Sequence, residues 1–232
     1  MLQKKTLPIF PLDLVLFPRQ ELPLRIFEPR YKQLVDDCML GDGQFGVCLI
    51  NSNSMVAGWE APHMVGTVVK ITKCADATPD GMQLQLETIG RNPFRITEMI
   101  PPSVARPITY DPHSIEGHHA ISKINEESGS GRMYLQAQVE MLPEIDGNVS
   151  ILQWENLVKL WKKKIIAGAP QPIEPHALDH VLEQYYLLTE TPTTDYVYSL
   201  AALGATTPQD LQPILESDTL EELVQNVGNL LG

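Results

Sequence analysis

The segment from Pro18 to Leu34 reads PRQELPLRIFEPRYKQL and combines the signals of a turn, a strand and a helix. Pro18 and Pro23 bracket a predicted turn, and the alternation from Leu24 to Phe27 is typical of a strand. Pro29 suits the first turn of a helix, where its missing N–H group would lack a partner in any case. We therefore expect a strand to pass almost directly into a helix here.

The predicted helix runs from Arg30 to Leu40, and Gly41 is expected to end it. Its apolar residues recur at the spacing of one helical face. They are Tyr31, Leu34, Val35, Cys38 and Met39.

Around this helix, residues 1–110 are rich in strand signals. A polar loop is expected at Asn51–Ser54 and a tight turn at Pro79–Gly81. Short strands joined by Gly and Pro turns indicate a small closed or partly open barrel rather than a parallel sheet. The expected strands cover 7–12, 24–27, 45–50, 65–74, 83–87 and a stretch that begins at Phe94.

The pattern weakens over 101–131, which is expected to be an irregular excursion ending in a flexible loop. Residues 133–141 alternate again and are predicted to return to the barrel. After Pro143 the spacing becomes helical. The expected helices cover 151–166, 175–190, 193–203, 207–216 and 218–231. The fold class is therefore α+β, with a barrel-like domain over 1–143 and a helical subdomain over 144–232.

The composition and net charge of the chain limit the kinds of molecule that it is expected to bind. The chain has 232 residues, 43% of them hydrophobic, and a net charge of −12 at pH 7, which is typical of a soluble globular protein. This charge argues against a broad electrostatic contact with nucleic acid or anionic lipid. Cys38, Cys48 and Cys74 form no C-x-x-C pair and are expected to be buried free thiols. No signal peptide or membrane-spanning segment is evident, so we expect a cytoplasmic protein.

Motifs of catalysis are weak. Gly41-x-Gly43-x-x-Gly46 has a helix before it and a strand after it, the reverse of the dinucleotide-binding order, so a helix end and turn is the better interpretation. His176 and His180 share a helical face but lack the general-base Glu of zinc proteases and an obvious third ligand. The sequence thus predicts no enzyme, no metal and no cofactor. A hydrolase of unknown type that uses these histidines or a cysteine stays open as an alternative.

An ordered set of residues gives a family resemblance. Beginning with Leu7-Pro8-x-Phe10-Pro11-Leu12, it continues through Pro18, Pro23 and Phe27-Glu28-x-Arg30-Tyr31 to Gly66-Thr67-Val68, Asp80-Gly81 and Gly90 before Phe94-Arg95-Ile96. The chain resembles the amino-terminal, substrate-recognition domain of Lon-type ATP-dependent proteases. Because it ends at Gly232 without an ATPase or peptidase module, it is most similar to free-standing Lon-domain proteins. It departs from the family at Pro93, where members usually carry Arg, and over 101–131, which is longer than usual.

The resemblance implies a PUA-like pseudo-β-barrel followed by a C-terminal helical bundle. We interpret the motif residues as determinants of this fold rather than as ligand contacts. Glu28 and Arg30 can pair or cap the helix start, and Tyr31 is expected to face the barrel. The full set is Pro18, Pro23, Glu28, Arg30, Tyr31, Gly66 and Gly81.

The leading functional hypothesis is a non-enzymatic module that recognises unfolded or exposed apolar polypeptide segments in protein quality control, with a protease or chaperone as partner. Such a site needs accessible apolar surface, to which Trp59, Met64, Met82 and Phe94 are the candidate contributors, although core burial is the alternative for each. RNA binding is the second hypothesis, because PUA-like folds often bind RNA. Against it stand the net charge and a basic patch, 159–164, that the end of a helix explains.

Overall fold

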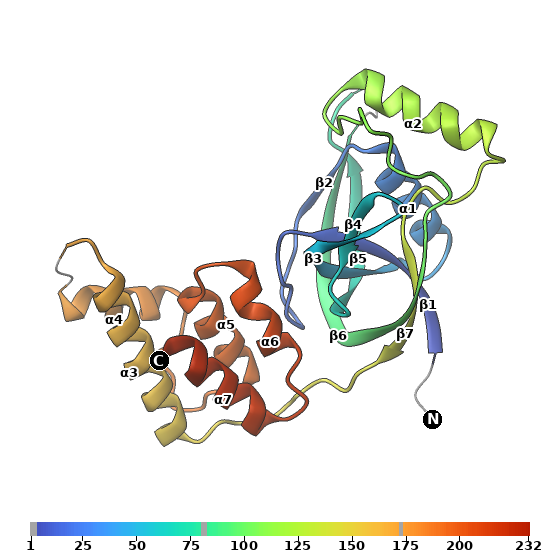
Figure 1. The fold of residues 1–232 in the computed structure, drawn as a ribbon. Coiled ribbons are helices and arrows are strands. Elements are labelled where there is room, and N and C mark those ends of the chain that lie inside the picture. The colour runs from blue at the N-terminus through green and yellow to red at the C-terminus, as the bar shows by residue number, and fades with distance from the viewer. Residues whose placement is uncertain (1–3, 80–82, 172–173) are drawn as a thin grey trace. The chain divides into compact units, whose positions relative to one another are not determined.

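The computed structural model describes residues 4–79, 83–171 and 174–232. The chain divides into two compact units, Met1–Pro143 and Glu144–Gly232. The first unit is built mainly of strands and the second of helices (Figure 1). Each unit is described by itself below.

Strands of the first unit form one mixed, mainly antiparallel sheet. The predicted strand-to-helix passage is present: a three-residue strand is followed by a helix that begins at Pro29 and has Gly41 as its C-cap. The elements are β1 (Lys4–Leu12), β2 (Leu24–Ile26), α1 (Pro29–Leu40), β3 (Gln44–Val56), β4 (Trp59–Pro62), β5 (Val65–Asp76), β6 (Leu84–Ile100), α2 (Ile115–Glu127) and β7 (Gln136–Met141).

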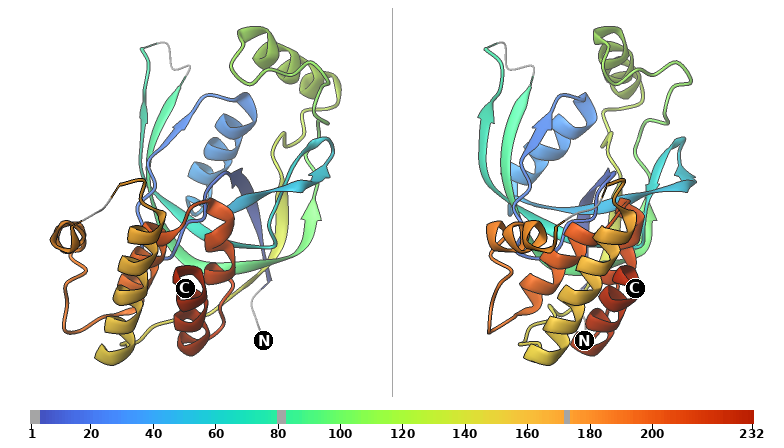
Figure 2. Two further views of the ribbon diagram at one scale, coloured as in Figure 1. Left: turned by 60° about the vertical axis from the view of Figure 1, so that its left-hand side comes forward. Right: turned by 90° about the vertical axis from the view of Figure 1, so that its left-hand side faces the viewer.

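Strand pairing closes the sheet into a ring. The order is β1-β7-β6-β5-β3, and β1 also pairs with β3 in parallel, with Ile9 opposite Gly46. The other pairings in the ring are antiparallel. In both views of Figure 2 the curved sheet lies on two sides of α1. Closure of this kind protects strand edges, but β2 and β4 lie outside the ring at its border.

Alternation along β1 sends its side chains into two separate cores, as strand geometry requires. Leu7 and Ile9 pack with Phe94 and residues of β7. Phe10 faces the other way and packs with the buried face of α1, including Tyr31. The expectation that Tyr31 faces the sheet is confirmed, since its ring centroid lies 4.0 Å from that of Phe10.

Several predicted boundaries were wrong. Residues 51–54, expected to be a polar loop, belong to β3, where a bulge shifts the register with β4. The two strands expected around Gly90 are one strand, β6, because bulges bend it while keeping it paired with β5 and then β7. The tight turn expected at Pro79–Gly81 lies mostly outside the described residues.

The excursion over 101–131 contains a regular helix, which corrects the prediction of irregular structure. Ser114 is the N-cap of α2, and its hydroxyl accepts a hydrogen bond from the N–H of Gly117. Ile121 is completely buried in a small core with Trp59, Val104 and Tyr110. His118 and His119 therefore lie on a helix rather than in the irregular chain predicted for this segment.

The second unit contains α3 (Ile151–Gly168), α4 (Pro175–Gln184), α5 (Thr194–Gly204), a 3-10 turn at Pro208–Leu211, α6 (Gln212–Leu215) and α7 (Leu220–Leu231). A capping box formed by Ser150 and Gln153 begins α3. Its Trp154, Leu157 and Trp161 are buried, and α3, α5 and α7 pack against one another. The helix expected over 175–190 ends earlier, at Gln184. The helix expected over 218–231 begins later, at Leu220, and is capped by Thr219.

Candidate functional site

A groove of about 280 Å³ opens on the first unit where the end of β1, the strand β2 and the start of α1 meet. Its walls are largely apolar, and charged side chains stand among them. Ile50 of β3 and Glu60 of β4 complete the border. The other lining residues are Phe10, Pro11, Leu12, Asp13, Leu24, Arg25, Ile26, Phe27, Glu28, Arg30 and Tyr31.

A nearly buried ion pair forms one end of the groove. Arg30 donates from Nε to Oε2 of Glu28 at 2.9 Å and from Nη2 to Oε1 at 3.3 Å. The two side chains are 16% and 11% exposed, respectively. Glu28 occupies the N-cap position of α1 but makes no side-chain cap hydrogen bond. Of the two predicted roles, pairing or capping of the helix start, Glu28 and Arg30 take the first, because Arg30 binds the carboxylate.

Aromatic rings hold the guanidinium of Arg30 in place. It lies 4.2 Å from the ring centroid of Tyr31 and 3.9 Å from that of Trp59, so cation–π attraction adds to the ion pair. The indole Nε1 of Trp59 donates to the carbonyl of Val104 at 2.8 Å. The hydroxyl of Tyr110 donates to Oε2 of Glu28 at 2.8 Å. Segment 101–131 is thus bound to the same cluster.

This environment fixes the protonation states of Arg30, Tyr31 and Tyr110. Burial alone would lower the pKa of Arg30, but Tyr31 and the carboxylate of Glu28 outweigh it and raise the value. Burial raises the pKa of Tyr31, and burial followed by the charge of Glu28 raises that of Tyr110. Arg30 therefore stays cationic and both phenols stay protonated at neutral pH. The cluster is suited to positioning and binding rather than to proton transfer.

One side of β2 borders the groove. Two backbone hydrogen bonds show which residues point their N–H and C=O groups toward β6. Gly90 N bonds to Gln20 O at 2.8 Å, and Leu22 N bonds to Thr88 O at 3.0 Å. The same register continues to the pairing of Leu24 with Leu86, so every second residue points toward β6. In this register the N–H and C=O groups of Arg25 point away from β6. No strand pairs with that side of β2 within 4–79, 83–171 and 174–232.

The candidate contact residues are not brought together at this groove. Phe94 is 0% exposed, so it is a core residue and presents no surface, because Gly46 and Gly66 leave the space that its ring fills. Trp59 is 5% exposed and lies beneath Arg30. Met64 is 45% exposed and does not line the groove. Met82 lies outside the described residues.

The motif residues have structural tasks that can be stated one by one. Pro18 and Arg19 are the central residues of a turn closed from Gln20 N to Phe17 O, in which Arg19 has φ +65°. Pro23 lies in the extended segment after this turn rather than at its end. A β-carbon at Gly66 would come within 2.4 Å of Cys48 Sγ and Val47 O. Gly81 lies outside the described residues.

Other chemically interesting side chains do not assemble into a site. Burial raises the pKa of the Cys48 thiol, and burial followed by Asp42 and Asp37 raises that of Cys38 to about 12. Cys74, expected to be buried, is partly exposed. Among the described residues, no group of three His, Cys, Asp or Glu side chains could hold a metal ion. None of the described helices is long and apolar enough to span a membrane.

Sequence reasoning missed Tyr110 and the open side of β2. The spacing of Tyr110 carries no signal, because it lies in a stretch without periodicity. The edge had a signal in Pro23, since a proline cannot donate to a sheet and is tolerated where its position faces outward. Pro23 lies two residues before Arg25, so its backbone nitrogen also points away from β6.

Comparisons with known proteins agree on one family. The family model of the substrate-binding domain of ATP-dependent protease La (Lon) matches residues 6–232. A Lon protease of Syntrophus aciditrophicus is 35% identical over 99 residues, which are 40% of this chain and 12% of that protein. A Lon N-terminal domain protein from Xanthomonas campestris has a similar fold, with a TM-score of 0.59, 23% identity and coverage of 95% of this chain and 96% of that one. The N-terminal domain of a Mycobacterium avium complex Lon protease gives a TM-score of 0.56 at 13% identity, covering 98% of each chain.

Proposed function

Because the chain belongs to the family of Lon substrate-binding domains, we propose that it recognises unfolded or exposed apolar polypeptide segments in the groove beside β2. The bound segment adds to β2 as an extended strand. The domain itself is not an enzyme, and a protease or chaperone acts on what it binds. The PUA-like pseudo-β-barrel, the C-terminal helical bundle and the cytoplasmic location belong to the same proposal.

The observation that carries the proposal is the way β2 borders the groove. Leu24, Arg25, Ile26 and Phe27 are consecutive, and all of them line it. One face of a strand would contribute only alternate residues, so the side of the strand, with its backbone groups, faces the opening. Addition of an extended segment to such an edge is a common mode of peptide recognition.

The size and chemistry of the groove suit an extended chain. Its volume of about 280 Å³ lies just below the range of about 300–1,000 Å³ typical of small-ligand pockets. Its walls offer apolar contact from Leu12 and Phe27, which are partly exposed, and this suits the side chains of an unfolded segment. Backbone pairing is independent of sequence, as recognition of varied substrates requires.

The four contact candidates take different parts in this proposal. Trp59 acts indirectly, by holding Arg30 at the end of the groove. Phe94 contributes only to the fold. Met64 is exposed and remains a candidate for contact with a longer segment, and Met82 remains a prediction from the sequence alone.

The test is a fluorescence-anisotropy titration with a labelled, permanently unfolded polypeptide, comparing Arg25→Pro with Arg25→Thr. Both variants lose the charge, but only proline removes the outward N–H group. Neither disturbs pairing with β6, and Pro23 shows that this edge accepts proline. We expect Arg25→Thr to bind like the parent and Arg25→Pro to bind about tenfold more weakly.

Thermal unfolding of both variants checks that the fold is retained. Equal affinities of Arg25→Pro and Arg25→Thr would show that the edge of β2 is not the site. A labelled RNA is the control ligand. Binding of RNA alone, weakening steeply with salt, would replace the polypeptide proposal by RNA recognition.

A further inference from the structure

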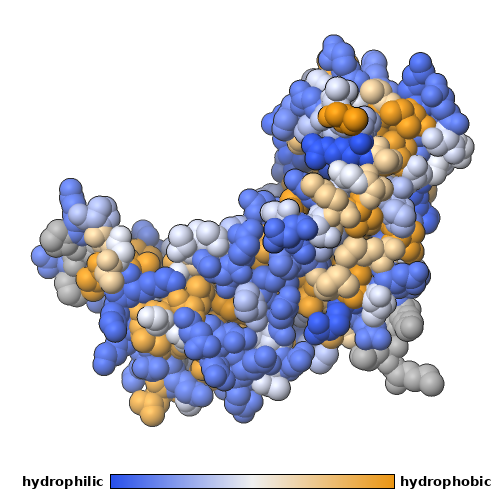
Figure 3. All heavy atoms as spheres, in the orientation of Figure 1, coloured by the Kyte–Doolittle hydropathy of each residue, from blue (hydrophilic) through white to orange (hydrophobic). Residues whose placement is uncertain are grey.

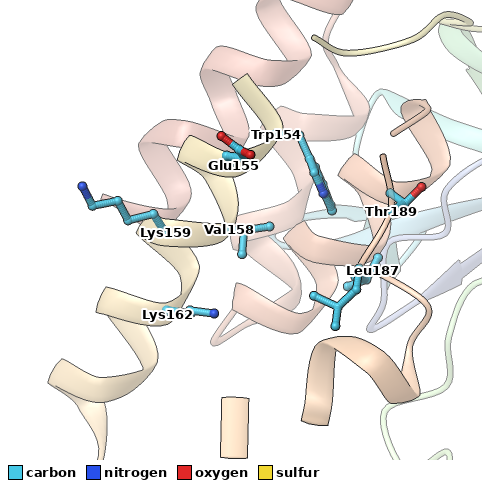
Figure 4. A pocket seen from close by; sticks show the side chains of 8 residues that line it. Trp154, Glu155, Val158, Lys159, Lys162, Leu187 and Thr189 are labelled. Carbon is cyan, nitrogen blue, oxygen red and sulfur yellow. The ribbon is translucent and has the colours of Figure 1, made fainter. Parts of the chain in front are cut away.

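A second concave site lies in the helical unit and shares no residue with the β2 groove. It is a pocket of about 370 Å³ between α3 and the segment that follows α4. Figure 4 shows Trp154 and Val158 of α3 facing Leu187 across it. Leu188 also lines the pocket and is 57% exposed. The lining is therefore apolar and partly open to solvent.

The local backbone explains why apolar side chains stay uncovered here. The chain leaves α4 through Tyr186, whose φ of +56° lies in the left-handed region. Leu187 N then bonds to Leu182 O at 2.7 Å, which directs Leu187 inward, where it is 1% exposed, and leaves Leu188 outside. Tyr185 and Tyr186 are also exposed, at 56% and 83%. Figure 3 shows hydrophobic residues at the surface of this unit near α4 and at one end of α3.

Charge on α3 is opposite to that of the whole chain. The helix carries four lysines, at 159 and 162–164, and one acidic residue, Glu155, in a chain of net charge −12. The ammonium of Lys162 binds the carboxylate of Asp179. Lys159 is exposed at the rim of the pocket and makes no ion pair among the described residues. The pocket thus combines an apolar floor with two exposed charged side chains in its lining, Glu155 and Lys159, of which Lys159 is unpaired among the described residues.

We propose that this pocket docks a segment of another protein that presents an aliphatic or aromatic side chain with a carboxylate about one helical turn away. The apolar side chain enters between Val158 and Leu188, and the carboxylate pairs with Lys159. A protein segment fits better than a lipid surface, because the site is concave. This site shares no residue with the proposed polypeptide groove.

The test uses a fluorescein-labelled, alanine-based helical peptide with a Leu and a Trp one turn apart and flanking Glu residues, together with a twin in which Lys replaces Glu. We expect the acidic peptide to bind and the basic twin to bind at least about fivefold more weakly. Leu188→Ser should weaken binding about tenfold through lost apolar burial. Lys159→Glu should weaken it about fivefold.

Lys163→Glu is the matched control, because it makes the same charge change on the same helix outside the pocket lining, and it should retain binding. Equal loss in Lys163→Glu and Lys159→Glu would overturn the proposal in favour of general charge attraction, and unchanged binding by Leu188→Ser would overturn use of the pocket. If anionic vesicles displaced the bound peptide, the partner of this pocket would be a membrane surface rather than a protein. Arg25→Pro should bind the acidic peptide normally, and loss there would show that the peptide reports on the β2 groove instead.

Discussion

The hydroxyl group of Tyr110 donates a 2.8 Å hydrogen bond to the carboxylate of Glu28, 82 residues earlier in the chain. The same carboxylate pairs with Arg30. Through this bond, the segment that carries α2 is tied to the point where β2 passes into α1. Phe27 extends the contact, since its ring stacks on that of His113 at 5.2 Å. The geometry of the β2 groove therefore depends on residues far away in sequence.

Tyr110→Phe should lower the free energy of unfolding of the strand-rich unit by about 1–3 kcal/mol, the range for a lost hydrogen bond to a charged group. Urea unfolding measures this. Hydrogen exchange of the α2 amides should also accelerate, because the segment loses one attachment. Tyr186→Phe, which changes an exposed side chain, is the control. Unchanged stability and exchange in Tyr110→Phe would show that the bond contributes nothing to this contact.

Phe94→Ala and Met64→Ala should separate core from surface among the candidate contact residues. Phe94 is fully buried against Gly46 and Gly66, so its truncation leaves a cavity and should cost about 3–5 kcal/mol. Met64 is 45% exposed, and its truncation should change stability by no more than about 0.5 kcal/mol. Urea unfolding of both variants checks this. Similar losses in the two would contradict the burial of Phe94.

The three thiols should differ in reactivity toward a thiol reagent such as iodoacetamide. Cys38 and Cys48 are buried, and burial raises the pKa of each. Cys74 is partly exposed, with a pKa raised by burial and then by Asp76 and Asp36. Mass spectrometry should find one modified thiol in the folded protein and three after unfolding. The rate at Cys74 should rise with pH as thiolate forms, and Cys74→Ser should abolish the reaction of the folded state.

Asp210 should stabilise the helical unit in a pH-dependent way. Hydrogen bonds from the N–H groups of Thr207 and Thr206 lower its pKa in the folded state. Its contribution is therefore complete above the unfolded pKa of about 4 and is lost as pH falls through the lower folded pKa. Asp210→Ala should cost about 0.5–2 kcal/mol at neutral pH, the range for a cap, and progressively less in acid.

Asp210→Asn is the matched control, because it keeps an acceptor oxygen without the ionisable proton. Its unfolding free energy, measured by urea titration at several pH values, should lack the part of the acid-dependent decrease that comes from residue 210. An Asp210→Ala difference that stays constant from neutral to strongly acid pH would contradict the role assigned to the carboxylate.

Local signals predicted much of the fold. The Pro29 start and Gly41 end of α1 were correct because both act within one turn of backbone. The return of the chain to the sheet near 133–141 was correct because alternation persists along β7. The helix α2 was not predicted, although Ser114 caps it. Its two histidines and the prolines before it obscure the helical spacing of apolar residues such as Ile121. The break expected near Gly90 was wrong because bulges, which depend on partner strands, replace the turn.

By itself, the sequence determined the passage from β2 into α1, the change from strand to helix character near Pro143 and the family, because these depend on local propensity and on ordered motif residues. Only the tertiary structure decided that Phe94 is core, that Arg30 is enclosed by Glu28, Tyr31 and Trp59, and that the backbone groups of Arg25 point away from β6. These features arise from pairing and packing between segments far apart in the chain. A residue's own type and near neighbours do not specify which distant backbone or ring will cover it.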